Sequence, residues 1–262
     1  MSGSGDRKSI FITGAASGIG RETARLFAHE GWFVGAFDVN AADLNALREE
    51  LGPQSGLFMV LDVCNRAAFA EVVKQFGAST SGKLDLLFNN AGMAVGGLFD
   101  EMAWEDLVKV INVNLLGVMS GIQLAMPLLR STPGSLCLTT SSSSSIFGTA
   151  GIAVYSATKH AVRGLTEALS IELKRYGVRA SDLLPGLIDT AILSDKMRAL
   201  APAEGMWRII SPVQVAQAVW SAYHGDLLHW YVPQELKEFD LQATAIPEIV
   251  REERAKLPIF TD

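Results

Sequence analysis

The sequence has few of the residues that mark secreted, metal-binding or nucleic-acid-binding proteins. Two cysteines in 262 residues are too few for a disulfide framework. Cys64 and Cys137 both lie among apolar residues, so we expect buried thiols in a reducing compartment. The four histidines are scattered along the chain, which argues against a metal site. The net charge of −6 comes without a basic stripe, which argues against nucleic acid as a partner.

Apolar runs long enough for a membrane are also nearly absent. The first eight residues lack the apolar core of a signal peptide. Residues 110–129 carry no charge and would be long enough to span a bilayer, but they include two asparagines, a glutamine and a proline. We therefore expect a helix that the protein buries on most sides, in a soluble, cytoplasmic protein without membrane contact.

The hydrophobic content of 49% is enough for one large core, and no linker or internal repeat divides the chain. We expect a single domain over residues 1–262. Short apolar strands alternate with helical patterns, and strands are predicted at 9–13, 32–37, 57–61, 84–88, 135–139, 178–184 and 228–232. This order predicts an α/β fold: a single-domain doubly wound (Rossmann) parallel sheet of about seven strands with helices on both faces. The carboxyl ends of the strands should form the ligand crevice.

A glycine-rich turn follows the first predicted strand. Gly14, Gly18 and Gly20 lie between this strand and a helical pattern. Glycines allow close backbone approach, and a helix N-terminus offers free N–H groups to a pyrophosphate. The second strand ends in Asp38, whose carboxylate can bind both ribose hydroxyls of an adenosine and would repel a 2′-phosphate. The alternative is that Asp38 caps the helix that starts near Ala41.

Tyr155 and Lys159 are spaced by one helical turn, so both side chains should share one face of a helix. A phenol has a pKa of about 10 and is a poor base near neutrality. We expect the ammonium of Lys159, in a partly desolvated cleft, to lower the pKa of Tyr155 so that it can donate and accept a proton. Five serines, 141–145, follow the fifth strand, so their start should lie at the same rim.

Further short motifs accompany the glycine-rich turn and the Tyr155–Lys159 pair. They are Asp62-Val63, Asn89-Asn90-Ala91-Gly92, Asn114, Ser142 thirteen residues before Tyr155, and Pro185-Gly186-x-x-x-Thr190. In this order and spacing the motifs resemble the short-chain dehydrogenase/reductase family, in its compact single-domain branch. The resemblance covers residues 8–225. One departure is Pro233-Gln-Glu, where the family often has a glycine-rich turn, so the partner contacts made at that edge stay open.

The resemblance implies an oxidoreductase that acts on a secondary alcohol or ketone with a nicotinamide cofactor. Asp38, with no Arg or Lys directly after it, favours NAD(H) over NADP(H). Ser142 would hydrogen-bond the carbonyl oxygen and Tyr155 would deliver the proton, while Ser141 and Ser143 stay open as substitutes for Ser142. Lys159 would hold the nicotinamide ribose, and Asn114 would anchor a water that leads protons to Lys159. Other cofactor contacts are expected from Gly14, Ser17, Gly18, Ile19, Gly20, Asp38, Asp62, Val63, Asn90, Ala91, Gly92, Pro185, Gly186, Ile188 and Thr190.

The resemblance and two apolar helices, 110–129 and 153–173, also predict a homodimer or homotetramer that pairs these helices across a twofold axis. The stretch 187–211 is long and irregular, and we expect it to be a substrate lid, whereas the tail 233–262 has no predicted place. Expected substrate contacts are Met93, Val95, Ser144, Ile152, Met197, Met206 and Trp207. They predict bulky hydrophobic or aromatic alcohols and ketones. The alternative is that these residues complete the core.

Two other functions stay open at this point. One is a nucleotide-sugar epimerase or dehydratase of a related fold, which the short chain disfavours. The other is a non-catalytic regulator that senses NAD(H). The full set of Asn114, Ser142, Tyr155 and Lys159 disfavours a sensor, because a sensor needs no proton donor beside the nicotinamide.

Overall fold

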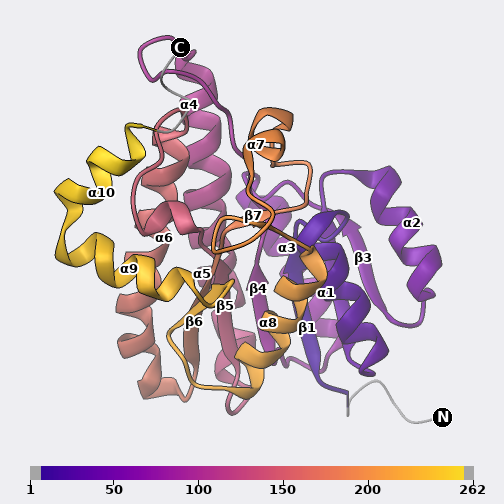
Figure 1. The fold of residues 1–262 in the computed structure, drawn as a ribbon. Helices are drawn as coiled ribbons and strands as arrows, with labels where there is room; N and C mark the ends of the chain where they lie inside the picture. The colour runs from indigo at the N-terminus through magenta and orange to yellow at the C-terminus, as the bar shows by residue number, and fades with distance from the viewer. Residues whose placement is uncertain (1–6, 257–262) are drawn as a thin grey trace.

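A seven-stranded parallel sheet forms the centre of the computed structural model, which describes residues 7–256 (Figure 1). The strands run in the order β3-β2-β1-β4-β5-β6-β9. They are β1 Ser9–Thr13, β2 Phe33–Asp38, β3 Gly56–Val60, β4 Leu86–Asn89, β5 Leu136–Thr140, β6 Arg179–Pro185 and β9 His229–Val232. The order reverses between β1 and β4, which is where ligands bind in sheets of this kind. The predicted fold class is therefore confirmed.

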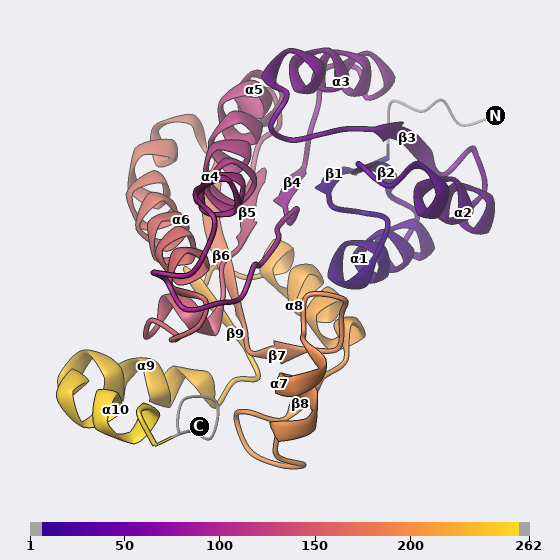
Figure 2. The same ribbon diagram turned by 90° about the horizontal axis from the view of Figure 1, so that it is seen from above.

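Helices cover both faces of the sheet (Figure 2). One face carries α1 Gly18–His29, α2 Ala41–Leu51 and α8 Pro212–His224, and the other carries α3 Arg66–Ser79, α5 Val118–Arg130 and α6 Ala153–Glu172. Strand residues alternate between these two cores, as the pleat requires. Ile10 and Ile12 pack beneath α1 and α8, whereas Phe11 between them packs beneath α3 and α5.

The helix that we expected around residues 104–129 is interrupted by one wide turn. It consists of α4 Trp104–Ile111, a π-helical turn over Asn112–Gly117, and α5. Turns of this type are frequent at functional sites. Asn114 lies in this turn and is completely buried.

The outer side of the same helix is less covered than we expected. The run Trp104–Arg130 is apolar and long enough to cross a membrane by length and composition alone, and 39% of its most apolar window is buried within the protein. The exposed fractions are 70% for Trp104, 49% for Leu116 and 46% for Met119. We predicted that the protein buries this helix on most sides. That prediction was wrong, because one face of the helix points away from the sheet.

The segments that sequence reasoning left irregular have defined structure. Within the 187–211 stretch, β7 Leu187–Ile188 pairs with β8 Ile209–Ile210, and α7 Asp195–Leu200 lies between them. The tail forms α9 Leu236–Ala245 and α10 Pro247–Arg254, which build a third hydrophobic cluster beside β6 and β9. The last predicted part of the tail, 257–262, lies outside the described residues.

Both cysteines are free, as expected, but they differ in burial. Cys137 lies inside β5 and is buried. Cys64 is exposed, which corrects our expectation, because it lies in the loop after β3 and not in the strand. Among residues 7–256, no group of histidine, cysteine and acidic side chains is arranged to hold a metal ion.

Candidate active site

A cavity of about 1340 Å³ opens at the carboxyl ends of the strands, where the order of the sheet reverses. The turn after β1 forms one wall. Ser17 is the N-cap residue of α1, and its side chain makes no capping hydrogen bond, so the first N–H groups of α1 are not satisfied by it. A helix N-terminus of this kind is suited to bind a phosphate group.

Two glycines in this turn are required by its shape. A Cβ atom on Gly20 would lie 2.0 Å from the carbonyl oxygen of Gly14, so no larger residue fits there. Gly18 has a φ of +50°, and a Cβ on it would lie 2.8 Å from the side chain of Thr190. The turn therefore brings bare backbone to the cavity wall, as close approach of a pyrophosphate requires.

Asp38 ends β2 at the far side of the cavity. Its carboxylate accepts hydrogen bonds from the backbone N–H groups of Ala16 at 3.0 Å and Asn40 at 2.9 Å. Each oxygen keeps a further lone pair for a ligand. The helix that follows is capped by Asn40, which accepts from Ala42 and Asp43, so the alternative that Asp38 caps α2 is wrong. The carboxylate is held where a ribose hydroxyl could reach it.

Polar side chains between β1 and β4 brace the middle of the cavity. The backbone N–H groups of Asn90 and Ala91 both donate to the Thr13 hydroxyl at 3.0 Å. The Asn90 amide donates to the carbonyl oxygens of Thr13 and Gly14 at 3.2 Å, and its oxygen accepts from Thr140. Asn90 therefore fixes the glycine turn in addition to lining the cavity.

Lys159, Tyr155 and Ser142 lie together on the opposite wall. The Lys159 ammonium donates to the carbonyl oxygen of Thr140 at 2.7 Å and lies 5.5 Å from the centre of the Tyr155 ring. The Ser142 side chain lies close enough to Tyr155 to lower the pKa of its phenol. Ser142 accepts from the backbone N–H of Ser144, which places its hydroxyl at the start of a short 3₁₀ turn. The helical spacing brings Tyr155 and Lys159 to the same wall as Ser142, and the choice of Ser142 among the serines stays a prediction.

The protonation of the pair differs from our expectation. Burial raises the pKa of Tyr155, and the nearby Ser142 side chain opposes that shift. Burial also lowers the pKa of Lys159 to about 8, because a nearly inaccessible ammonium loses its hydration. The prediction that Lys159 lowers the Tyr155 pKa was therefore wrong for this structure. A raised pKa keeps the phenol protonated at neutral pH, which suits a proton donor.

Asn114 acts through the backbone of the neighbouring loop. Its side chain accepts from the N–H of Met93 and donates to the Met93 carbonyl oxygen, both at 2.9 Å. The Asn114 amide also donates to the Thr158 hydroxyl, and that hydroxyl donates in turn to the carbonyl oxygen of Tyr155. The π-turn thus ties the loop after β4 to the helix that carries Tyr155. The water-anchoring role of Asn114 stays a prediction.

Most predicted site residues line this cavity. They are Gly14, Ser17, Gly18, Ile19, Asp38, Asp62, Val63, Asn90, Ala91, Gly92, Met93, Ser142, Ser144, Ile152, Tyr155, Lys159, Pro185, Gly186, Ile188, Thr190 and Met197. Gly20 and Asn114 shape it from behind. Val95 is not among the lining residues. Met206 and Trp207, which we expected to cover the substrate, pack instead against the cluster built by α9 and α10.

Sequence reasoning missed several residues of the cavity. Thr140, the partner of Lys159, is the last residue of β5, so the rule that strand ends gather at the crevice could have found it. Lys109 and Lys196, which were not among the predicted site residues, also line the cavity. Both lie on helices whose orientation no local pattern reveals.

A family model described as short chain dehydrogenase matches residues 8–200. The chain is a short-chain dehydrogenase. It shares 36% identity with 3-oxoacyl-(acyl-carrier-protein) reductase FabG from Thermotoga maritima, over 81% of this chain and 88% of that protein. It shares 32% identity with cyclohexanol dehydrogenase from an Acinetobacter species, over 84% of this chain and 88% of that protein.

Solved structures of similar proteins confirm the fold of this short-chain dehydrogenase. A short-chain dehydrogenase/reductase from Burkholderia phymatum, determined in complex with NAD, has a TM-score of 0.82 and 26% identity, covering 94% of this chain and 96% of that one. Levodione reductase has a TM-score of 0.77 and 28% identity, covering 86% and 95%. The protein is therefore an oxidoreductase of this family, built on the fold that binds NAD in a relative.

Proposed function

We propose that this short-chain dehydrogenase uses NAD(H) to interconvert a secondary alcohol and a ketone, and that its substrate is bulky and hydrophobic or aromatic. The observation that carries the proposal is that Ser142, Tyr155 and the buried Lys159 line the same cavity, with the Lys159 ammonium 5.5 Å from the centre of the Tyr155 ring. Two hydroxyls on one wall of a cavity can bind one carbonyl oxygen between them.

The shape of the cavity fits a dinucleotide. The open N-terminus of α1 would bind the pyrophosphate, Asp38 the adenosine ribose and Lys159 the nicotinamide ribose. NAD(H) supplies the hydride when it is bound. The residues of the chain hold the carbonyl oxygen at Ser142, donate the proton from the Tyr155 hydroxyl, and keep the cationic Lys159 behind that hydroxyl.

Apolar side chains support the choice of a hydrophobic substrate. Met93, Leu98, Ile152, Leu193 and Met197 line the cavity. The cationic Lys109 lies within electrostatic reach of Cys64, beside the loop after β3, so we place it at the adenosine end. Lys159 and Lys196 also line the cavity, so its wall is not purely apolar. The names of two relatives, cyclohexanol dehydrogenase and levodione reductase, favour the alcohol and ketone class.

A substrate panel tests this function. We expect the highest kcat/KM for an aryl-alkyl ketone or a steroid ketone, and lower values for a small polar ketone, a keto acid and a 3-oxoacyl thioester. The measurement is oxidation of NADH followed by absorbance at neutral pH. If the polar or anionic substrates are preferred by more than about tenfold, equivalent to about 1.4 kcal/mol, the hydrophobic assignment fails. If no substrate is reduced or oxidised, the proposed function fails.

The second expectation concerns the cofactor. The anionic Asp38 should repel a 2′-phosphate, so we expect kcat/KM to favour NADH over NADPH by about a hundredfold, since like charges placed together cost several kcal/mol. The nearby Arg21 does not offset this, because it pairs with Glu50 at 2.9 Å. Asp38→Asn should remove most of the discrimination. Asp43→Asn, in the first turn of α2, is the matched control and should preserve it. A wild-type preference for NADPH would contradict the role given to Asp38.

The third expectation concerns assembly. The exposed side chains of Leu116 in the π-turn, Met119 on α5 and Ile171 on α6 form apolar surface that water would otherwise cover. We expect a homodimer or homotetramer that buries these helices against a second copy. Light scattering should give a mass of two or four times 28.1 kDa, and Leu116→Lys combined with Met119→Lys should reduce it. Val60→Lys, at an equally exposed apolar residue of the β3 edge, should not. A wild-type monomer at micromolar concentration would contradict the proposal.

The cytoplasmic location stays a prediction.

A further inference from the structure

The serine run after β5 is held by its own hydroxyls. The Ser145 hydroxyl donates to the carbonyl oxygen of Ser142 at 2.6 Å. The Ser141 hydroxyl lies 3.0 Å from the Ser145 hydroxyl and 3.1 Å from the carbonyl oxygen of Lys159. All three serines are buried. The position of the Ser142 hydroxyl therefore depends on where Ser145 is held.

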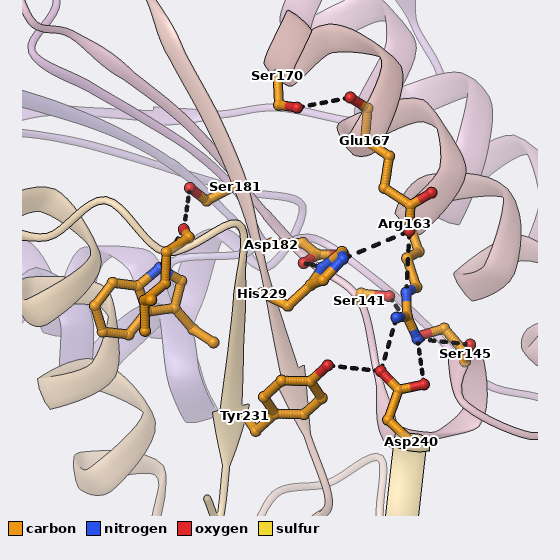
Figure 3. A network of polar contacts seen from close by, with 12 residues as sticks. Ser141, Ser145, Arg163, Glu167, Ser170, Ser181, Asp182, His229, Tyr231 and Asp240 are labelled. Carbon is orange, nitrogen blue, oxygen red and sulfur yellow. Dashed lines mark hydrogen bonds and ion pairs between the residues drawn. The ribbon is translucent and has the colours of Figure 1, made fainter. Parts of the chain in front are cut away.

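Arg163 contacts this turn from α6, one helical turn after Lys159. Its guanidinium lies 3.5 Å from the carbonyl oxygen of Ser145 and makes two parallel hydrogen bonds to Asp240, at 3.1 Å and 2.7 Å (Figure 3). Asp240 lies 77 residues further along the chain, on α9. The same carboxylate accepts from the Tyr231 hydroxyl at 2.6 Å. Helix α9 thus reaches the serine turn through Arg163, in addition to the apolar packing of Leu236 and Phe239 in the cluster that contains Ile146.

The Arg163–Asp240 pair is well suited to fix a geometry. The side chains are 19% and 11% exposed, so both charges are largely removed from water. The two parallel hydrogen bonds between a guanidinium and a carboxylate are strong and directional. Without the Asp240 carboxylate, Arg163 would keep only the more exposed Glu167, at 3.2 Å, as an acidic partner, and its guanidinium would shift toward Glu167. Movement of Arg163 would break its contact with the carbonyl oxygen of Ser145.

We propose that Asp240 is a positioning residue for the Ser142 hydroxyl, acting through Arg163 and Ser145. Helix α9, in the tail that follows the last strand of the sheet, then contributes to the alignment of the reacting groups without touching them. This inference rests on the proposed function, because it assigns Ser142 the role of binding the carbonyl oxygen.

Kinetics of Asp240→Asn provide the first test. The substitution keeps the size of the side chain and removes its charge. We expect kcat to fall about tenfold, because a shift well below 1 Å in a reacting group is enough for a loss of that size. The dissociation constant for NADH, from fluorescence titration, should stay unchanged, because the glycine turn and Asp38 lie on other elements. Glu235→Gln is the matched control. It removes the ion pair with Arg208 from the same C-terminal region, and it should leave kcat unchanged.

A double-mutant cycle separates positioning from general stability. Ser145→Ala removes the hydroxyl that holds the Ser142 carbonyl, so Asp240→Asn should have little further effect on kcat in that background. Effects that multiply in full would overturn the proposal, as would an Asp240→Asn enzyme whose Tm falls while kcat is unchanged. Should Asp240→Asn fold poorly, Arg163→Lys takes its place, since an ammonium keeps the charge but cannot contact both Asp240 and Ser145.

Amide hydrogen exchange tests the same idea without any activity. The N–H groups of Ser145 and Ile146 donate to the carbonyl oxygens of Ser142 and Ser143 within the turn. Their exchange should accelerate in Asp240→Asn and stay at the wild-type rate in Glu235→Gln. An unchanged rate overturns the proposal. Because this readout needs no turnover, a wild-type protein that reduces no ketone would refute the proposed function while leaving the positioning test decisive.

Discussion

We expect the Tyr155→Phe variant to fold and to bind NADH normally, but to lose about a thousandfold in kcat, within the range known for removal of a general acid. The substitution deletes one oxygen and leaves the ring in the cavity wall. The Ser142 hydroxyl would still bind the carbonyl oxygen, but no proton would follow. Because burial raises the pKa of Tyr155, the wild-type phenol holds its proton at neutral pH and the loss should be clearest for ketone reduction.

The measurement is NADH oxidation with the preferred ketone, together with the NADH dissociation constant from fluorescence titration. Tyr176→Phe is the control, since that ring stacks with Arg130 and Arg175 away from the cavity and the same oxygen is deleted. A Tyr155→Phe enzyme with kcat within a factor of about three of wild type would refute the assignment, because the general acid would then lie elsewhere.

The second large effect concerns Lys159, whose replacement should change activity and stability in opposite directions. Lys159→Met should abolish measurable turnover and weaken NADH binding, yet raise the free energy of unfolding at pH 7 by about 2 kcal/mol. The lowered pKa corresponds to about 3 kcal/mol, and loss of the hydrogen bond to Thr140 offsets about 1 kcal/mol of it. The reason for the gain is that Lys159 is 4% exposed and its ammonium has one protein hydrogen bond, to Thr140. Burial lowers its pKa from 10.5 to about 8, so the folded state disfavours the charge that the reaction needs. Methionine fills a similar volume without that charge.

The pH dependence of the gain identifies its origin. Between pH 8 and 10.5 the unfolded lysine binds more protons than the folded one, so wild-type stability rises with pH in this window. The advantage of Lys159→Met should be complete below pH 8 and disappear by about pH 10.5. Urea unfolding at pH 7 and pH 10 measures it. An advantage that is equal at both values would mean that better packing, and not loss of a buried charge, is responsible.

Residues close together in the chain carried most of the correct sequence-based predictions. Gly14, Gly18 and Gly20 occupy one turn, and Tyr155 and Lys159 are one helical turn apart, so their geometry follows from local structure. Asp38 could be placed because strand ends gather at one edge of a parallel sheet. The ends of the strands were predicted to within two residues, because apolar runs and turn residues alternate clearly along the chain.

The errors arose where a distant segment decides the environment. Met206 and Trp207 have the composition of a lid, but α9 and α10 provide a hydrophobic cluster that takes both side chains. The pKa of Tyr155 depends on how much of the fold covers it, which spacing from Lys159 does not reveal. The link from Asp240 to Arg163 spans 77 residues, and neither residue stands out in its local sequence.

The wide turn over Asn112–Gly117 also affects how this sequence compares with others. A π-turn accommodates one extra residue while the helix on either side keeps the same faces toward the core. Leu107 and Ile122 would therefore stay buried in a chain one residue shorter here, but Asn114 would no longer oppose the backbone of Met93. We therefore expect the fold to tolerate a one-residue deletion at this turn, whereas the deletion would displace Asn114 from Met93. A relative whose alignment needs a single-residue gap at this turn would be a folded protein that lacks the Asn114 contact.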